Sequence, residues 1–274
     1  MGPGKASTGT TVVPEEDETM TGRRFPAFLI AAVLTLTAVW AAPANAAGGS
    51  ISAVLFVIEA WDAGQNYGRV ELYRNPAAGS VINWNLTDPV EIFSNDPGKT
   101  PLGTVSDLSA YLDADPVVSI GFAITAPATS VSYTITSAVV GFAPLVNPAA
   151  IASAAITVTD SDGNGAVASP LFAGGTRFFQ ATSNAGVYAG LIAGPLTAAP
   201  YASAAASDAL PASGYGSVAG TVTSIQTAFS FNITPNDQVS GTGVFHVVPE
   251  PGGLAALATG LSGMAALLLR RRVG

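Results

Sequence analysis

The chain has 274 residues, of which 10% are charged and 49% are hydrophobic, and its formal net charge at pH 7 is -8. It contains no cysteine, which excludes disulfide bonds, thiolate metal sites and cysteine nucleophiles. Between residues 47 and 248, acidic residues outnumber basic ones. Because binding to phosphates requires clustered positive charge, we exclude nucleic acid as a partner.

Residues 20–46 have the order of a secretory signal peptide. Arg23 and Arg24 precede an apolar stretch, and Ala44 and Ala46 provide the small side chains that signal peptidase reads. We expect signal peptidase to remove this segment from the exported protein. An uncleaved membrane anchor is the alternative, but the apolar stretch is short for a permanent span.

Residues 1–19 stand before the basic segment with which a signal peptide normally starts. They are polar and show no hydrophobic periodicity. We therefore expect either that Met20 is the true start or that residues 1–19 form a disordered lead.

Residues 47–248 predict one exported domain that is mainly β. In residues 130–136 and 229–233, apolar side chains alternate with Ser, Thr or Asn, as a half-buried strand requires. Clusters of Asn, Asp, Pro and Gly mark turns between such segments. Further strands are expected at residues 51–58, 68–73, 81–86, 117–124, 151–159, 218–227 and 239–247.

The number of short strands favours an antiparallel β-sandwich, with a jelly-roll-like arrangement as one form of it. The sequence also predicts a short helix at residues 105–112. Residues 198–216, rich in Ala, Ser, Gly and Pro, are expected to form a long loop.

A possible calcium site follows the strand expected at residues 151–159. Asp160, Asp162 and Asn164 place oxygen atoms at alternate positions before a glycine, which resembles the first half of an EF-hand or dockerin calcium loop. Leu171 stands where such loops carry their bidentate carboxylate. The same residue types favour a tight hairpin turn, which we expect, and weak calcium binding completed by another segment is the alternative.

Two pairs of acids are candidates for glycoside hydrolysis, which requires two carboxyl groups ~5–9.5 Å apart. The neighbouring sequence does not mark either pair as catalytic. Trp61 and Tyr67 could pack in the core or form a modest sugar platform beside Glu59. The candidate pairs are Glu59 with Asp62 and Asp113 with Asp115.

His246 is the only histidine in the chain, and we expect it at a solvent-facing position of a strand. A single histidine cannot build a histidine-based metal centre, and the sequence marks no catalytic partner for it. The chain also contains no nucleophile elbow, phosphate loop or zinc motif. We therefore predict no catalytic residue and no cofactor, apart from the possible calcium ion.

A proline-rich motif opens the C-terminal tail at residues 249–251. Pro249 and Pro251 fix their own φ and favour extended backbone at the residues before them. Glu250 places one charge between the two prolines. This motif predicts a stiff, extended peptide that a processing enzyme can bind.

Residues 252–274 predict a transmembrane helix. The segment from Leu254 to Leu269 carries no charge, and as a helix at ~1.5 Å per residue it would reach about 24 Å. This length is short of the ~30 Å hydrocarbon core and suits a temporary tether. The positive-inside rule keeps the terminal arginines in the cytoplasm and the preceding domain on the other side. These arginines are Arg270, Arg271 and Arg272.

The combination of Val248-Pro249-Glu250-Pro251, an apolar run and a terminal arginine cluster resembles the PEP-CTERM sorting signal of Gram-negative bacteria. The resemblance covers about residues 248–272. It implies that an exosortase in the membrane recognises the motif and processes the tail, and it associates the protein with exopolysaccharide and biofilm. A plain membrane anchor and a GPI attachment signal are the alternatives, but a GPI signal does not end in three arginines.

Taken together, these features predict an exported protein that is tethered to the inner membrane as a precursor and then reaches the cell surface or extracellular matrix. We expect it to have a structural or binding role and not to be an enzyme. Its expected partners are signal peptidase, exosortase, the membrane and possible exopolysaccharide ligands. The alternative is a secreted carbohydrate-active enzyme or lectin that uses acidic residues of the β domain.

Overall fold

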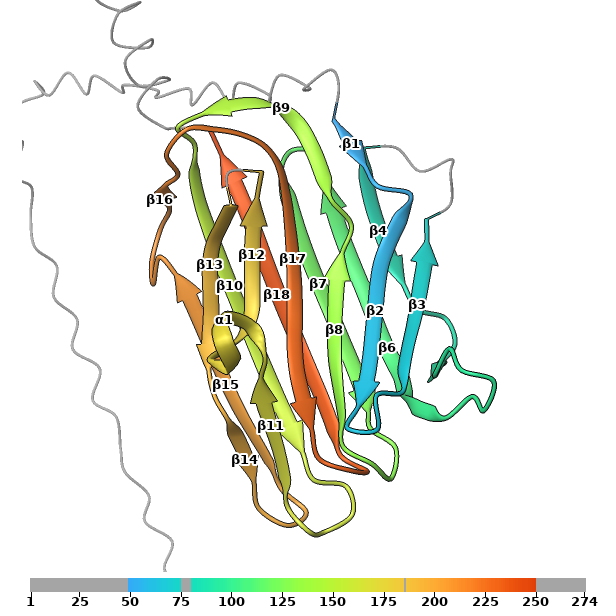
Figure 1. Ribbon diagram of the computed structural model, residues 1–274. Coiled ribbons are helices and arrows are strands. Elements are labelled where there is room, and N and C mark those ends of the chain that lie inside the picture. Colours follow the sequence, from blue (N-terminus) through green and yellow to red (C-terminus); the bar gives the residue numbers. More distant parts are fainter. Residues whose placement is uncertain (1–48, 75–79, 185, 250–274) are drawn as a thin grey trace, which may run out of the picture. The chain divides into compact units, whose positions relative to one another are not determined.

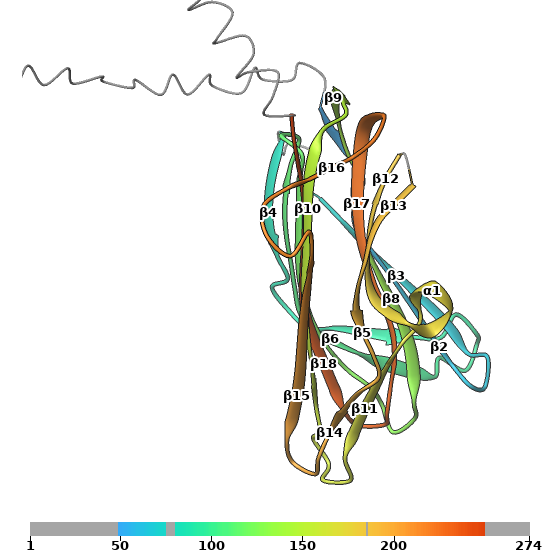
Figure 2. The same ribbon diagram turned by 90° about the vertical axis from the view of Figure 1, so that its left-hand side faces the viewer.

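The computed structural model of the protein describes residues 49–74, 80–184 and 186–249. The predicted signal peptide with Ala44 and Ala46, and the tail from Glu250 onward, lie outside these residues. The described residues are mainly strands, in two antiparallel sheets that form the two layers seen in Figures 1 and 2. This arrangement is consistent with the predicted β-sandwich. In this part of the chain, no helix is long and apolar enough to span a membrane.

The first layer is a ten-stranded sheet in which β1, β9, β17, β8, β2 and β3 are consecutive neighbours. β11 and β12 also pair with β17, β13 pairs with β12, and β14 pairs with β11. The strands are β1 (Ser50–Ile51), β2 (Val54–Asp62), β3 (Tyr67–Tyr73), β8 (Val131–Ser137), β9 (Val140–Val146), β11 (Ala166–Pro170), β12 (Arg177–Ser183), β13 (Gly186–Ala193), β14 (Leu196–Ala198) and β17 (Thr221–Ile233).

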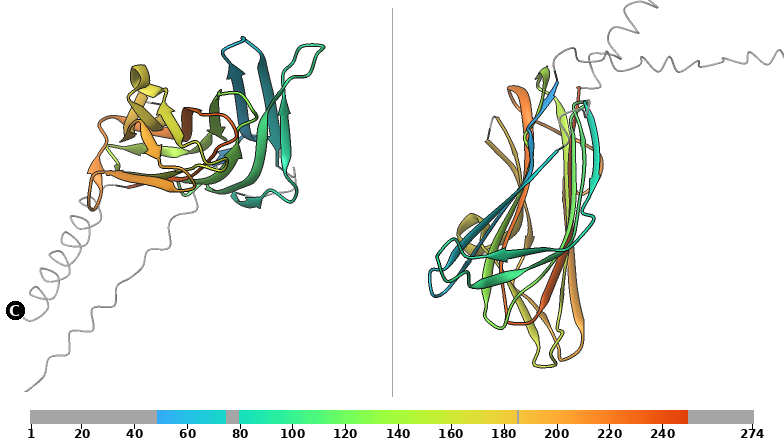
Figure 3. Two further views of the ribbon diagram at one scale, coloured as in Figure 1. Left: turned by 90° about the horizontal axis from the view of Figure 1, so that it is seen from below. Right: turned by 90° about the vertical axis from the view of Figure 1, so that its right-hand side faces the viewer.

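The second layer is an eight-stranded sheet with the order β15-β10-β18-β7-β6-β4, in which β16 also pairs with β10 and β5 with β6. Seen from below, β2 to β6 lie at one side of the domain and β11 to β15 at the other (Figure 3). A single helical turn, α1 (Phe172–Gly175), lies between β11 and β12 in the chain. The strands are β4 (Val81–Asn85), β5 (Val90–Phe93), β6 (Pro101–Asp113), β7 (Val117–Thr125), β10 (Ala149–Thr159), β15 (Ser203–Leu210), β16 (Gly216–Ser217) and β18 (Gln238–Val248).

The helix predicted at residues 105–112 is wrong, because these residues belong to the long strand β6. The pairing of β6 with β7 shifts register between Val105 and Asp107, which marks a bulge. The bulge separates the buried Val105 and Leu108 by three positions, and Leu112 is buried further along. A bulge thus produces the spacing of a helical apolar face within a strand.

The long loop predicted at residues 198–216 is also wrong. β15 pairs with β10 over eight consecutive positions, from Ser203 opposite Thr159 to Leu210 opposite Ala152. β16 adds a second short pairing to the start of β10. Alanine and serine have little intrinsic preference for strands, so the pairing with a well-formed neighbour decides the conformation here.

Aromatic rings fill the centre between the sheets. Phe229 of β17 lies 4.9 Å from Phe122 of β7 and 4.9 Å from Phe179 of β12, measured between ring centroids. Opposite these rings, β18 has buried glycines. A Cβ on Gly243 would lie 2.4 Å from the ring of Phe179, and one on Gly241 would lie 2.7 Å from Phe122. The glycines of β18 therefore leave the space that the rings occupy.

We predict that Gly243→Ala destabilises the domain by about 1–3 kcal/mol, because its methyl group would force the Phe179 ring out of place. Gly98→Ala is the matched control, since Gly98 is exposed and its new Cβ would lie 3.3 Å from only the Asp96 carboxylate. Urea denaturation of both variants and the parent measures the difference. Equal midpoints for the parent and Gly243→Ala would contradict this account of the core.

Candidate functional site

A row of aromatic and charged side chains covers the outward face of the β2–β3 hairpin. Along β2, buried Ile58 and Ala60 alternate with the half-buried Glu59 and Trp61. In the antiparallel register, Glu59 lies opposite Arg69 and Trp61 lies opposite Tyr67. Because opposed residues point to the same face of a sheet, these four side chains gather on the outside of the sandwich.

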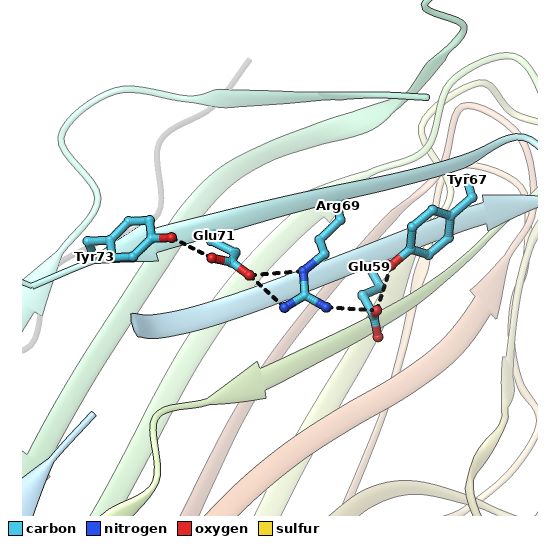
Figure 4. A network of polar contacts seen from close by, with 5 residues as sticks. All are labelled: Glu59, Tyr67, Arg69, Glu71 and Tyr73. Carbon is cyan, nitrogen blue, oxygen red and sulfur yellow. Dashed lines mark hydrogen bonds and ion pairs between the residues drawn. The ribbon is translucent and has the colours of Figure 1, made fainter. Parts of the chain in front are cut away.

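Figure 4 shows this row as a continuous line of contacts from Tyr67 to Tyr73. The Tyr67 hydroxyl donates a hydrogen bond to Glu59 at 2.6 Å, and an Arg69 nitrogen lies 3.4 Å from the same Glu59 oxygen. Arg69 donates two hydrogen bonds to one oxygen of Glu71, at 2.6 and 3.0 Å. The Tyr73 hydroxyl donates to the other Glu71 oxygen. These five side chains are called the β3 row below.

The contacts of the β3 row change the pKa values of its members. Hydrogen bonds from Tyr73 and then Arg69 lower the pKa of Glu71, and the bond to Glu71 raises the pKa of Arg69. The hydrogen bonds to Glu59 and Glu71 raise the pKa values of Tyr67 and Tyr73, respectively. These shifts favour the ionised forms of Glu71 and Arg69 and the neutral forms of the two phenols.

The β3 row is open to solvent. Tyr67 is 40% exposed and Tyr73 is 61% exposed. The residues of β3 that point outward are two positions apart, so the row from Tyr67 to Tyr73 is about 20 Å long at ~3.4 Å per residue. An exposed row of this length suits an extended ligand.

Small polar side chains continue the same face across β8 and β17. Trp61 lies opposite Ser132, which lies opposite Asn232, and Glu59 lies opposite Thr134. The Asn232 amide donates a hydrogen bond to the Ser132 hydroxyl at 3.1 Å. The hydroxyl residues predicted on one face of residues 130–136 thus extend the outward face beside the β3 row.

One acid of each pair considered from the sequence accepts hydrogen bonds within a turn. Asp62 is the last residue of β2 and accepts hydrogen bonds from Asn66 across the turn to β3, and the Asn66 amide lowers its pKa. Asp113 accepts a hydrogen bond from the backbone N–H of Asp115 in the turn between β6 and β7. The acid that joins Glu59 is Glu71, which sequence spacing alone did not identify.

The residues of the possible calcium site form a corner between β10 and β11. These two strands belong to different sheets, so the predicted hairpin turn is wrong and the chain crosses between layers here. Asp160, only 3% exposed, accepts backbone hydrogen bonds from Gly163, Gly165 and Tyr201. The buried Asp160 carboxylate therefore stabilises the corner.

A further acid, Asp237, joins this corner from the turn before β18. Carboxylate oxygens of Asp160, Asp162 and Asp237 lie within 4.8 Å of one another. Asp237 is fully buried and accepts hydrogen bonds from the backbone of Ser161 and from the Thr234 hydroxyl. The Asn164 amide instead donates to Asp162. Of the calcium ligands predicted from the sequence, the Asp160 and Asp162 carboxylates thus lie together, and the third carboxylate beside them is Asp237 from a distant segment.

The two buried acids have opposite pKa shifts. Burial raises the pKa of Asp160, but the backbone hydrogen bonds from Tyr201, Gly165 and Gly163 outweigh it and the net shift is downward. Burial raises the pKa of Asp237, with smaller contributions from Asp160 and Asp162, and the bonds from Thr234 and Ser161 do not compensate. Ionised Asp237 is therefore the less favourable charge of the corner.

His246 lies on β18, as predicted, but it is half-buried and has a partner. Its Nδ1 lies 2.8 Å from the Tyr215 hydroxyl, and the two rings meet edge to face. Burial lowers the pKa of His246, although Asp115 and Asp113 act in the opposite direction. The pair ties the segment before β16 to β18.

We predict that Asp237→Asn raises the melting temperature by a few degrees at pH 7 but not near pH 4. A raised pKa means that the Asp237 contribution is fully present below the ordinary carboxyl pKa of ~3.9 and is lost as pH rises through the folded-state pKa. Asp160→Asn is the matched control with the opposite sign, since the stabilisation by Asp160 is lost as pH falls through its lowered pKa.

Thermal denaturation with calcium and with a chelator completes this test. If the corner is a turn stabilised by hydrogen bonds alone, the melting temperature of the parent stays the same in both. If calcium raises it, and Asp237→Asn abolishes that rise, the corner is a calcium site and hydrogen bonds alone do not account for its stability.

Comparisons with known proteins do not place this chain in a family. No protein-family model matches it, and no curated protein matches it. Among solved structures, a structure of the Gt strain of infectious bursal disease virus is 14% identical, with 74% of this chain and 65% of that chain covered and a TM-score of 0.13. The D431N mutant VP2 protein of the same virus is 10% identical over 74% of this chain and 77% of that chain, with a TM-score of 0.11. Scores this low support no inference about fold or function.

Proposed function

We propose that the protein is an exported surface or matrix protein of a Gram-negative bacterium, with a jelly-roll-like ectodomain that binds exopolysaccharide. In this proposal signal peptidase removes residues 20–46, and a transmembrane helix in residues 252–274 tethers the precursor. An exosortase then processes the tail at Pro249, Glu250 and Pro251. The β3 row is the observation that carries the binding role.

The chemistry of the β3 row supports a carbohydrate ligand. Sugar rings have apolar faces formed by C–H groups, which pack on aromatic rings such as the exposed Tyr67 and Tyr73 and the half-buried Trp61. Their hydroxyl groups donate well to carboxylates, and the contacts of Arg69 and Tyr67 converge on a single oxygen of Glu59. The internal contacts also hold the side chains in place before binding, which lowers the entropy cost of association.

The charge of the β3 row favours a neutral polysaccharide over an anionic one. Arg69 is its one cation and already contacts two glutamates. The row therefore has one net negative charge, and it offers acceptors and aromatic faces in place of free cations. An anionic polymer would be repelled by this charge, within an acidic chain.

The same geometry favours binding over hydrolysis. A glycosidase needs one carboxyl group with a raised pKa to act as an acid, whereas the pKa of Glu71 is lowered by Tyr73 and Arg69. Arg69 also stands between the two glutamates in the space that a scissile bond would need. The enzyme alternative therefore has less support than the binding role.

We predict that the double variant Tyr67→Ala and Tyr73→Ala weakens binding to a neutral polysaccharide by about tenfold. The matched control is Tyr111→Ala, since Tyr111 is 42% exposed on the other sheet and its hydroxyl also contacts a carboxylate, that of Asp113. Affinity electrophoresis measures binding to a neutral polysaccharide in gels that contain dextran and to an anionic polysaccharide in gels that contain alginate. Equal retardation of parent and double variant in dextran, or stronger retardation in alginate, would overturn the proposed site.

The tail has a separate test. Replacing Pro249, Glu250 and Pro251 by alanine should leave membrane insertion intact, because the apolar run is unchanged, while unprocessed precursor accumulates. Mass spectrometry of the C-terminus shows whether the tail is cleaved in the parent and in the variant, both produced in a strain that processes such tails. A plain anchor predicts an uncleaved tail in both parent and variant, and that outcome would remove the sorting role without affecting the β3 row.

A further inference from the structure

The described chain begins and ends at the same end of the sandwich, the upper end in Figures 1 and 2. Ser50 of β1 pairs with Gly141 of β9, and Val248 of β18 pairs with Ala149 at the start of β10. Pro249 follows Val248 directly and is exposed. This end therefore carries the attachment to the tail.

The length of chain after Pro249 limits how far this end can be from a membrane. Four residues, 250–253, separate Pro249 from the uncharged run that begins at Leu254. Crossing from Pro249 to Leu254, even a fully extended chain spans at most about 18 Å at ~3.6 Å per residue. The polar layer of a bilayer takes up roughly 5–8 Å of that distance. While the tail is inserted, the upper end of the domain must lie at or near the membrane surface.

This end exposes apolar side chains that the core does not use. Val146 at the end of β9 is 68% exposed, Val187 at the β12–β13 tip is 60% exposed, and Tyr215 is 48% exposed. The segment of residues 215–221 connects these three side chains. Val146 lies opposite Thr221, Val187 and Val218 line one shallow cavity of about 320 Å³, and Gly216, next to Tyr215, lies opposite Ala150. We call Val146, Val187 and Tyr215 the end patch.

We propose that the end patch docks the domain onto the lipid surface while the tail holds the precursor in the membrane. This inference rests on the proposed membrane-tethered precursor. The end patch itself carries no charge, so burying it in the headgroup region desolvates no ion. Tyr215 suits this boundary because its ring is apolar, while its hydroxyl already has a hydrogen-bond partner in His246.

Two acids beside His246 decide which side of this end faces the lipid. Asp113 ends β6 and Asp115 lies in the turn to β7, and both are close enough to act on the pKa of His246. This turn belongs to the eight-stranded sheet, whereas Val146 and Val187 belong to the ten-stranded sheet. The domain docks with the valines toward the bilayer and the two aspartates away from it, so neutral lipid supports docking better than anionic lipid.

The absence of cysteine from the chain allows a direct test with the full-length protein. Val187→Cys receives an environment-sensitive fluorophore, and Ser161→Cys, exposed at the opposite end beyond β10, is the matched control. Both proteins are reconstituted into phosphatidylcholine vesicles with and without a spin-labelled lipid. We expect quenching of the label at 187 to exceed that at 161 by about twofold or more. Adding Val146→Asp should reduce the quenching at 187 to the level at 161.

Flotation with the vesicles separates this inference from the proposed function. If the full-length protein does not float, the tail does not insert and the tethered precursor itself is refuted. If it floats but the labels at 187 and 161 are quenched equally, the docking inference alone is overturned. If the signal at 187 instead changes with protein concentration without vesicles, the end patch contacts a second copy, and lipid docking is again overturned.

Discussion

The fit of aromatic rings against the glycines of β18 is the contact on which the rest of the sandwich depends. The two sheets meet through Phe122, Phe179 and Phe229, and these rings fit only because Gly241 and Gly243 have no Cβ. With no disulfide available to the chain, burial of these large apolar surfaces is the main source of stability. A side chain at either glycine would push the layers apart locally, because protein cores are close-packed.

Because the inner faces of the sheets form the core, the side chains on the outer faces are not restricted to apolar residues. On β2, Glu59 and Trp61 alternate with the buried Ile58 and Ala60 and point away from the rings, so a charge and a tryptophan are tolerated there. The β3 row occupies such positions, with its glutamates neutralised in part by Arg69. A rigid scaffold thereby holds side chains whose hydrogen bonds would be difficult to maintain on a mobile loop. The proposed ligand site and the core thus lie on opposite faces of the same strands.

The sequence predicted strands well where alternation was regular and failed where a distant partner decided the structure. Residues 130–136 alternate strictly and form β8, but the bulge in β6 imitates helical spacing, and only pairing with β7 reveals it. The contact of Glu59 with Arg69 requires the register of β2 and β3, which no local pattern specifies. Asp237 comes from a turn far along the chain, so the corner at Asp160 could be only half identified from sequence.

On the proposed route, the same end of the domain must suit two environments in turn. Before tail processing it lies at the lipid surface, and afterward it faces water. A large apolar surface would favour the first state but promote aggregation in the second. Val146 and Val187 are each a single exposed valine at a strand end, bordered by the polar Asn147, Asn184 and Ser217. A contact of this size can support a domain that the tail already holds in place, because tethering raises its effective concentration at the membrane. Without the tail that advantage is lost, so release follows cleavage with no further change in the domain.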